Sequence, residues 1–221
     1  MDGEKSRSRV KSSSASPHSA ADRTKADILE VATAEFAEKG YNGARVDLMA
    51  AKTKTSKRMI YYHFTDKEGL FTAVLEESYR SMRAYERTLD VEKIDPETAM
   101  RALVAGTFDY QASHERFVRL VADENVHRGA HLKNTGVAGS FGSGVIDMLT
   151  GIYERGVAAG VFRPGISALH LHMTISALAF FNVANRSTFS LIFNHDMTSP
   201  KALAERRQVV VETVMRFVRA P

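Results

Sequence analysis

Residues 44–70, ARVDLMAAKTKTSKRMIYYHFTDKEGL, decide the fold of the N-terminal part of the chain. Apolar residues at helical spacing predict a short helix over about 45–52, and Ser56 is placed to cap a second short helix that follows a turn. The run Thr65-Asp66-Lys67-Glu68 has the pattern of a capping box, so a longer helix is expected to begin there. The stretch therefore predicts two short helices joined by a tight turn, followed by a long helix.

The excess positive charge of the chain lies within this same stretch. All 221 residues together carry a formal net charge of +4. Between Arg45 and His63, five basic side chains stand against one acid, Asp47, so this window accounts for the whole surplus. Such a concentrated basic segment favours an anionic partner, and nucleic acid and a membrane surface are the usual two. The basic residues are Arg45, Lys52, Lys54, Lys57 and Arg58.

The rest of the composition narrows the function classes. The best apolar run, 175–184, is about half the length that a membrane-spanning helix needs. The absence of cysteine excludes disulfides, thiolate metal sites and thiol nucleophiles. The sequence shows no nucleophile elbow, phosphate-binding glycine loop or catalytic triad, so we expect no enzyme, no catalytic residue and no cofactor. We expect a cytoplasmic protein that does not bind a membrane, with residues 1–22 as a disordered, basic, serine-rich tail.

Two short helices joined by a tight turn are what a helix-turn-helix DNA-binding unit requires. The first helix holds the second at an angle that fits the major groove, and residues near the start of the second helix face the base edges. Lys57 and Arg58 occupy those early positions, and the arginine suits a bidentate contact to guanine. Tyr61 also suits a packing role in the core. Residues suited to phosphate and sugar contacts are Tyr61, Tyr62, His63 and Lys67.

This segment resembles the DNA-binding domain of the TetR family of bacterial transcriptional regulators, whose pattern is approximately T-x-x-x-I-A-x-x-A-G-V-S-x-x-x-L-Y-x-x-F-x-x-K-x-x-L. With a preceding helix that contains ILEVATAEFAEKGY, the resemblance covers about residues 24–75. It implies an all-α protein with a three-helix DNA-binding domain over 23–70 and a larger helical domain over 71–221. The matching residues are Met49, Ala50, Ser56, Ile60, Tyr61, Phe64, Lys67 and Leu70.

Three residues depart from the family pattern. Arg45 stands where a threonine or serine usually caps the first short helix, and its guanidinium adds a group that can reach a phosphate. Lys54 replaces the turn glycine, so either it adopts a left-handed conformation at a cost of about 1 kcal/mol or the turn takes another shape. Thr55 replaces an apolar residue. The predicted DNA-binding set is Arg45, Lys54, Thr55, Ser56, Lys57, Arg58, Tyr61, Tyr62, His63 and Lys67.

Beyond the long helix, the pattern remains helical to the end of the chain. Asp95-Pro96 and Ser199-Pro200 each place a capping residue before a proline, which is a strong helix-start signal. The last two long helices are rich in apolar residues on nearly every face, as burial against both a core and a second subunit requires. Helices are predicted over 96–114, 115–127, 142–159, 168–184 and 200–218.

The resemblance implies that the larger domain binds a small effector and that the last two long helices form a homodimer. Two-fold pairing would present two recognition helices to a palindromic operator in double-stranded DNA. We therefore expect a repressor that a small molecule of unknown identity releases from its operator. The alternative is a DNA-binding factor without an effector, which acts architecturally or through a protein partner.

The effector-binding residues are predicted from polar and aromatic groups set among apolar ones. An arginine in the cavity would favour a carboxylate ligand through charge pairing. Glu124, His127 and His131 have a metal-compatible spacing, but Gly129 interrupts it, so we expect no metal site. The predicted effector-binding residues are Asn125, His127, Arg128, His172, Phe181, Asn182 and Asn185.

Overall fold

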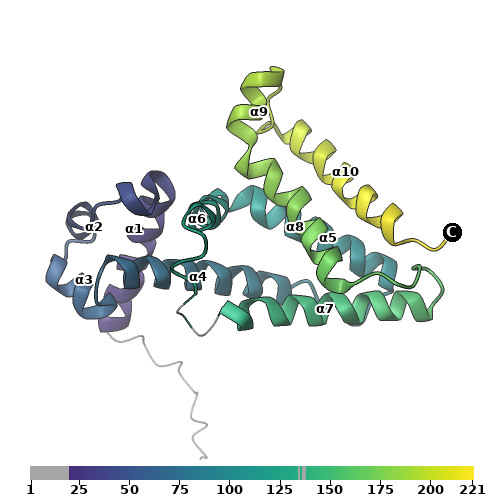
Figure 1. Cartoon of the computed structure of the whole chain (residues 1–221), viewed down its shortest axis with the longest axis horizontal. Coiled ribbons are helices and arrows are strands. Elements are labelled where there is room, and N and C mark those ends of the chain that lie inside the picture. Colours follow the sequence, from purple (N-terminus) through teal and green to yellow (C-terminus); the bar gives the residue numbers. More distant parts are fainter. Residues whose placement is uncertain (1–19, 134, 136–137) are drawn as a thin grey trace, which may run out of the picture.

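The computed structural model describes residues 20–133, 135 and 138–221. These residues form ten helices and no strand, which confirms the predicted all-α fold. Helices α1 to α3 gather at one end, and α4 runs from them into the larger half (Figure 1). In chain order the helices are α1 (Ala20–Gly43), α2 (Val46–Lys52), α3 (Lys57–Phe64), α4 (Lys67–Arg87), α5 (Pro96–Ser113), α6 (Glu115–Val126), α7 (Ala138–Ala158), α8 (Ala168–Ala184), α9 (Arg186–Phe193) and α10 (Pro200–Val218).

The small N-terminal unit is held together by one apolar core to which α1, α2, α3 and the first half of α4 contribute. Phe36 of α1 meets Phe71 of α4 edge to face, with ring centroids 4.9 Å apart. Ile60 and Phe64 anchor the inner side of α3 in this core. Because α4 continues without a break into the larger half, the predicted domain boundary at residues 70/71 falls inside one helix.

The turn between α2 and α3 takes the first of the two shapes that the sequence allowed. Lys54 has a φ of +52°, so it adopts the left-handed conformation at the position of the family's glycine. The amide of Thr55 donates to the carbonyl of Ala50 at 3.1 Å, and the Ser56 hydroxyl accepts from the amide of Met59 at 3.2 Å. The predicted Ser56 cap is therefore present. Arg45 precedes α2 without capping it.

Several helix ends differ from the sequence-based expectation. The first helix begins by Ala20, inside the tail predicted over 1–22, so residues 20–22 are helical; the rest of the predicted tail, 1–19, lies outside the described residues. Thr65 does not cap α4, because it has a φ of +68° and Asp66 accepts from the amide of Gly69 at 2.7 Å instead. Helix α9 is not among the helices predicted from the sequence.

The larger half is built around α5, which packs against α7, α8 and α10. Pro96 begins α5 and Pro200 begins α10, each after a side chain that accepts a backbone hydrogen bond, as predicted. Phe162 fills the space beside Gly156, where a Cβ would stand 1.9 Å from the phenylalanine ring. A second apolar cluster, formed by Met82, Tyr110, Phe117, Val118 and Val183, joins α4, α5, α6 and α8.

Candidate nucleic-acid interface

The outer face of α3 is a compact set of exposed polar and aromatic side chains. Lys57 and Arg58 lie in its first turn, immediately after the Ser56 cap, and both are exposed. Tyr62 is 79% exposed and Tyr61 40% exposed. Ile60 and Phe64 hold the opposite side of the helix in the core. The exposed face is therefore free to enter the major groove of DNA, which is about 12 Å wide.

The basic side chains predicted for DNA binding differ in how far contacts within the protein restrain them. Arg45 donates to Asp47 at 2.6 Å, an exposed pair that restrains its guanidinium. Lys67 lies over the ring of Tyr41, 5.0 Å from the centroid, and burial lowers its pKa. Within the described part of the chain, Lys54, Lys57 and Arg58 form no ion pair. These three are the freest cations of the predicted set.

The remaining predicted DNA-binding residues lie at the edges of this face. Thr55 is half-buried in the turn, and its backbone amide donates a hydrogen bond to the carbonyl of Ala50. His63 is also half-buried, and its Nε2 atom has no hydrogen-bond partner among the described residues. Its ring lies 5.3 Å from that of Tyr62, which points outward. Tyr62 is therefore better exposed for DNA contact than His63.

The predicted effector-binding residues do not come together in one place. Asn125 and Arg128 are exposed at the end of α6, and Asn125 donates to the carbonyl of Val121 on its own helix. Asn182 is 3% exposed and His172 is half-buried on α8. Two further predicted residues, Phe181 and Asn185, are exposed.

His127 lies where the small N-terminal unit contacts the end of α6. Its Nε2 is 3.3 Å from the side-chain nitrogen of Asn42, just beyond the end of the regular part of α1. Nearby, the amide of Tyr41 donates to Asp123 at 2.7 Å, and Arg119 donates to the carbonyl of Ala37 at 2.6 Å. These bonds connect the DNA-binding unit to the larger half, and we call them the α1–α6 joint.

His131, which has the metal-compatible spacing noted in the sequence, also lies at the α1–α6 joint. Glu124 accepts from Nδ1 of His131 at 2.6 Å and from the His131 amide at 2.9 Å. The His131 ring lies 4.3 Å from that of Tyr41. Over the described ranges, no group of three or more metal-ligating side chains is close enough to hold a metal ion.

The structure reveals buried polar groups that the sequence analysis missed. Arg83 and Glu86 lie one turn apart on α4, and their side chains are 13% and 3% exposed. Burial lowers the pKa of Arg83 and raises the pKa of Glu86 to about 7. Gln111 of α5 is 3% exposed. The available signal was the position of Glu86 in line with Tyr79 and Met82, a charge inside an otherwise apolar stripe.

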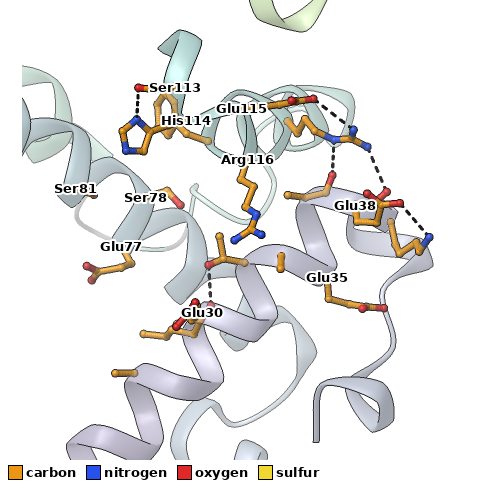
Figure 2. Close-up of a pocket in the computed structure, with 18 of the residues that line it drawn as sticks. Glu30, Glu35, Glu38, Glu77, Ser78, Ser81, Ser113, His114, Glu115 and Arg116 are labelled. Atoms are coloured by element: carbon orange, nitrogen blue, oxygen red, sulfur yellow. Dashed lines mark hydrogen bonds and ion pairs between the residues drawn. The ribbon is translucent and has the colours of Figure 1, made fainter. Parts of the chain in front are cut away.

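An open groove of about 1300 Å³ lies between α1, α4 and α6. Its lining carries charges of both signs, and Figure 2 shows Arg116 extending from α6 toward α1. Glu35 of this groove is buried and accepts from Lys52 at 2.9 Å, so Lys52 is bound to α1. The groove has no concentrated charge or enclosed apolar surface to select a ligand.

Among the described residues, no helix has the length and apolar character to cross a membrane.

Comparisons with known proteins cover both halves of the chain. Residues 28–74 match the family described as Bacterial regulatory proteins, tetR family, and residues 96–214 match Tetracyclin repressor-like, C-terminal domain. The chain is 35% identical over 199 residues to the HTH-type transcriptional repressor NicS of Pseudomonas putida. The aligned region covers 90% of this chain and 94% of that protein.

Solved structures share the fold at lower identity. A bacterial regulatory protein in the tetR family from Rhodococcus RHA1 has a TM-score of 0.72 at 22% identity, over 90% of this chain and 98% of the other. The ketosteroid transcriptional regulator KstR2 of Mycobacterium tuberculosis has a TM-score of 0.68 at 20% identity, over 90% and 96% of the two chains. These likenesses concern the fold.

Proposed function

Because the chain belongs to the TetR family of bacterial regulatory proteins, we propose that it is a homodimeric transcriptional repressor that a small-molecule effector releases from a palindromic operator. The 35% identity to the repressor NicS supports repression as the sign of regulation. The family is one of regulators, so the chain is not an enzyme.

The exposed face of α3 is the observation that carries the proposal. Lys57 and Arg58 stand at the start of this helix and form no ion pair among the described residues. Arg58 can donate two hydrogen bonds to the O6 and N7 atoms of guanine, a contact that contributes about 1–3 kcal/mol of discrimination. Around it, the proposed phosphate contacts come from Lys54, Tyr62 and Lys67, and such contacts fix the position of the helix on the duplex.

An exposed apolar face on the last two long helices supports the dimer. Met173 is 60% exposed on α8, and Val209 is 51% exposed on α10. Apolar patches of this kind on a single subunit mark interaction sites. A two-fold axis that pairs α8 and α10 with the same helices of a second subunit would cover them. The further members of this face are Leu169, Phe181 and Phe217.

The α1–α6 joint supplies a route from the effector domain to the DNA. Asp123 and Arg119 of α6 bind the backbone of Tyr41 and Ala37, so a shift of α6 moves α1 and, with it, the core that carries α3. An effector that favours a wider spacing of the two recognition helices lowers operator affinity by population shift. A DNA-binding factor that has no effector would remain bound to its operator in the presence of every metabolite.

The test begins with selection of an operator from a randomised DNA duplex pool by the full-length protein. We expect a site with two-fold symmetry that binds two chains. The double variant Lys57→Glu/Arg58→Glu should lose at least about 100-fold in affinity for that site, since it places repulsive charge in the groove. The matched control reverses two exposed charges outside α3, Arg80→Glu on α4 and Lys201→Glu at the start of α10. Equal affinity of the double variant and the control would contradict the assignment of α3.

A further inference from the structure

Helix α9 makes few apolar contacts within its own subunit. It is eight residues long, its first turn has no side-chain cap, and, within the described part of the chain, none of its residues is buried. Helices as short as this are at best marginally stable in water, so their order depends on apolar contacts with their surroundings. A contact outside the subunit would supply what α9 lacks.

One side of α9 attaches it to the end of α8. The half-buried ring of Phe189 lies 6.0 Å from that of Phe181 on α8 and 4.4 Å from that of Phe193, measured between ring centroids. The backbone amide of His195, just after the helix, donates to the carbonyl of Ser190 at 3.1 Å. Figure 1 shows α9 at the top of the view, where α8 ends and α10 begins. These contacts fix the position of α9 and leave its other side facing outward.

The outward side of α9 is apolar. Leu191 is 83% exposed, Ile192 72% and Phe193 62%, and we call these three residues the α9 tip. Monomeric soluble proteins rarely leave several large apolar side chains exposed together, and such patches mark interaction sites. The α9 tip therefore has the character of a contact surface.

The sequence around the tip selects the kind of partner. Residues 187–194, STFSLIFN, contain no charged side chain. Nucleic acids and anionic membranes are bound through lysine and arginine. The nearest such residue, Arg186, is half-buried, and its Nη1 lies 3.6 Å from Oε2 of Glu115. Interfaces between identical subunits are more apolar than other protein contacts. The tip therefore suits a second copy of this chain better than either anionic surface.

The tip also continues the apolar face that the proposed dimer covers. Phe181 is an exposed member of that face, and Phe189 connects its ring to that of Phe193 in the tip. A second subunit that packs on this end of α8 would reach α9 as well. One interface would then bury both the α8 face and the tip.

We propose that α9 is an arm of the homodimer, whose tip packs against the other subunit and stabilises the pair. Two-fold symmetry gives each subunit one arm that contacts the other. The inference rests on the proposed function for the existence of the dimer. That dimer places only α8 and α10 in the subunit interface, and α9 enlarges the interface with a third element.

Sedimentation velocity on the full-length protein measures how much the tip stabilises the dimer. Leu191→Gln should raise the dimer dissociation constant at least about tenfold, since it places a polar side chain in an apolar contact. Val126→Gln on α6 is the matched control, because Val126 is 77% exposed and belongs to another surface. Its dissociation constant should equal that of the wild type.

Thiol labelling tests directly whether the tip is covered. The chain contains no cysteine, so Leu191→Cys and Val126→Cys each carry one reactive thiol. The two positions have similar exposure in the single chain. We expect maleimide to modify Leu191→Cys at least about tenfold more slowly than Val126→Cys in the dimer, once each rate is divided by that of the urea-unfolded variant.

The outcomes distinguish the arm from the dimer. Equal labelling rates, or an unchanged dissociation constant for Leu191→Gln, would overturn the arm and leave the dimer of α8 and α10 in place. Protection of Leu191→Cys only after addition of phosphatidylglycerol vesicles would assign the tip to a membrane and also overturn the arm. A wild-type chain that sediments as a monomer at every concentration would count against the homodimer of the proposed function and, with it, against the arm.

Discussion

The carboxylate of Asp123 accepts a hydrogen bond from the backbone amide of Tyr41 at 2.7 Å, across 82 positions of the chain. Gly40, the residue before, has a φ of +68° and ends the regular part of α1. A Cβ on Gly40 would stand 2.9 Å from Oδ1 of Asp123. The end of α1 is therefore shaped to receive this carboxylate, and the contact connects the DNA-binding unit to α6.

Asp123→Ala should weaken both stability and effector response. It leaves the Tyr41 amide without its partner in a half-buried place, at a cost of about 1–3 kcal/mol in the free energy of unfolding. The coupling between effector and operator should fall as well, because α6 loses one of its connections to α1. Urea unfolding and operator release measure the two effects. Val126→Ala on the same helix is the control, since Val126 is 77% exposed; an equal change in both variants would refute the role of the joint.

Arg58→Ala and Lys67→Ala should weaken DNA binding in different ways. The arginine is placed to contact base edges, so its loss should reduce the preference for the operator over mutated sites by about 1–3 kcal/mol. We expect the lysine to contact a phosphate, so its loss should lower affinity evenly across sequences and reduce the salt slope by about 0.9. Binding to matched and mismatched duplexes at several salt concentrations distinguishes them. The assignment is wrong if both variants show the same pattern.

The helices that the sequence predicted well have local signals at their ends. Ser56 caps α3, and Asp95 and Ser199 cap α5 and α10, so the residue types themselves carry the information. Helix α9 has no such signal: it has no side-chain cap and no buried residue, and it ends at Asn194 with a φ of +46°. It packs against the end of α8, where the rings of Phe181 and Phe189 lie 6.0 Å apart, and no local pattern encodes that contact.

The exposure of the outer face of α3 was predictable for a similar reason, and the burial of Arg83 and Glu86 was not. Lys57 and Arg58 belong to a motif whose spacing fixes their orientation. Arg83 and Glu86 have the i, i+3 spacing of an ordinary surface pair, and their burial depends on helices from other parts of the chain that pack against α4, such as α5 and α7. Burial of this kind is a tertiary property.

Gly69→Ala and Gly151→Ala should have opposite effects on stability. A Cβ on Gly69 would stand 2.2 Å from the carbonyl oxygen of Phe64, so α3 and α4 would have to separate, at a cost of about 1–3 kcal/mol. Operator affinity should fall with it, since α3 changes its angle. A Cβ on Gly151, within α7, would meet nothing within 4 Å, and alanine there should stabilise the helix by about 0.5–1 kcal/mol. Thermal unfolding measures both; a destabilised Gly151→Ala together with an unaffected Gly69→Ala would contradict this packing.

The raised pKa of Glu86 predicts a stability change with pH. Its folded-state pKa of about 7 lies above its ordinary value of 4.5, mainly because the side chain is buried. The folded protein therefore binds more protons than the unfolded chain between these pH values, and the free energy of unfolding falls as pH rises through this window. Relative to Glu86→Gln, which does not titrate, the wild type should lose up to about 3 kcal/mol between pH 4.5 and 7. Urea unfolding of both proteins at a series of pH values gives the difference; a difference that is flat or rises would exclude a buried, proton-binding Glu86.

Met173→Glu should separate the subunits of the proposed dimer. Met173 is 60% exposed on α8 of the single chain, on the same apolar face as Leu169. A carboxylate buried there against a second subunit would be unpaired, so the dimer dissociation constant should rise at least about 100-fold, equivalent to about 3 kcal/mol. Sedimentation velocity measures the change. Operator affinity should fall in parallel, because two linked recognition helices bind a palindrome far more tightly than one. Ala84→Glu, which adds the same charge to an exposed position of α4, should leave both quantities unchanged. If Met173→Glu remains a dimer with full operator affinity, this face of α8 does not pair the subunits.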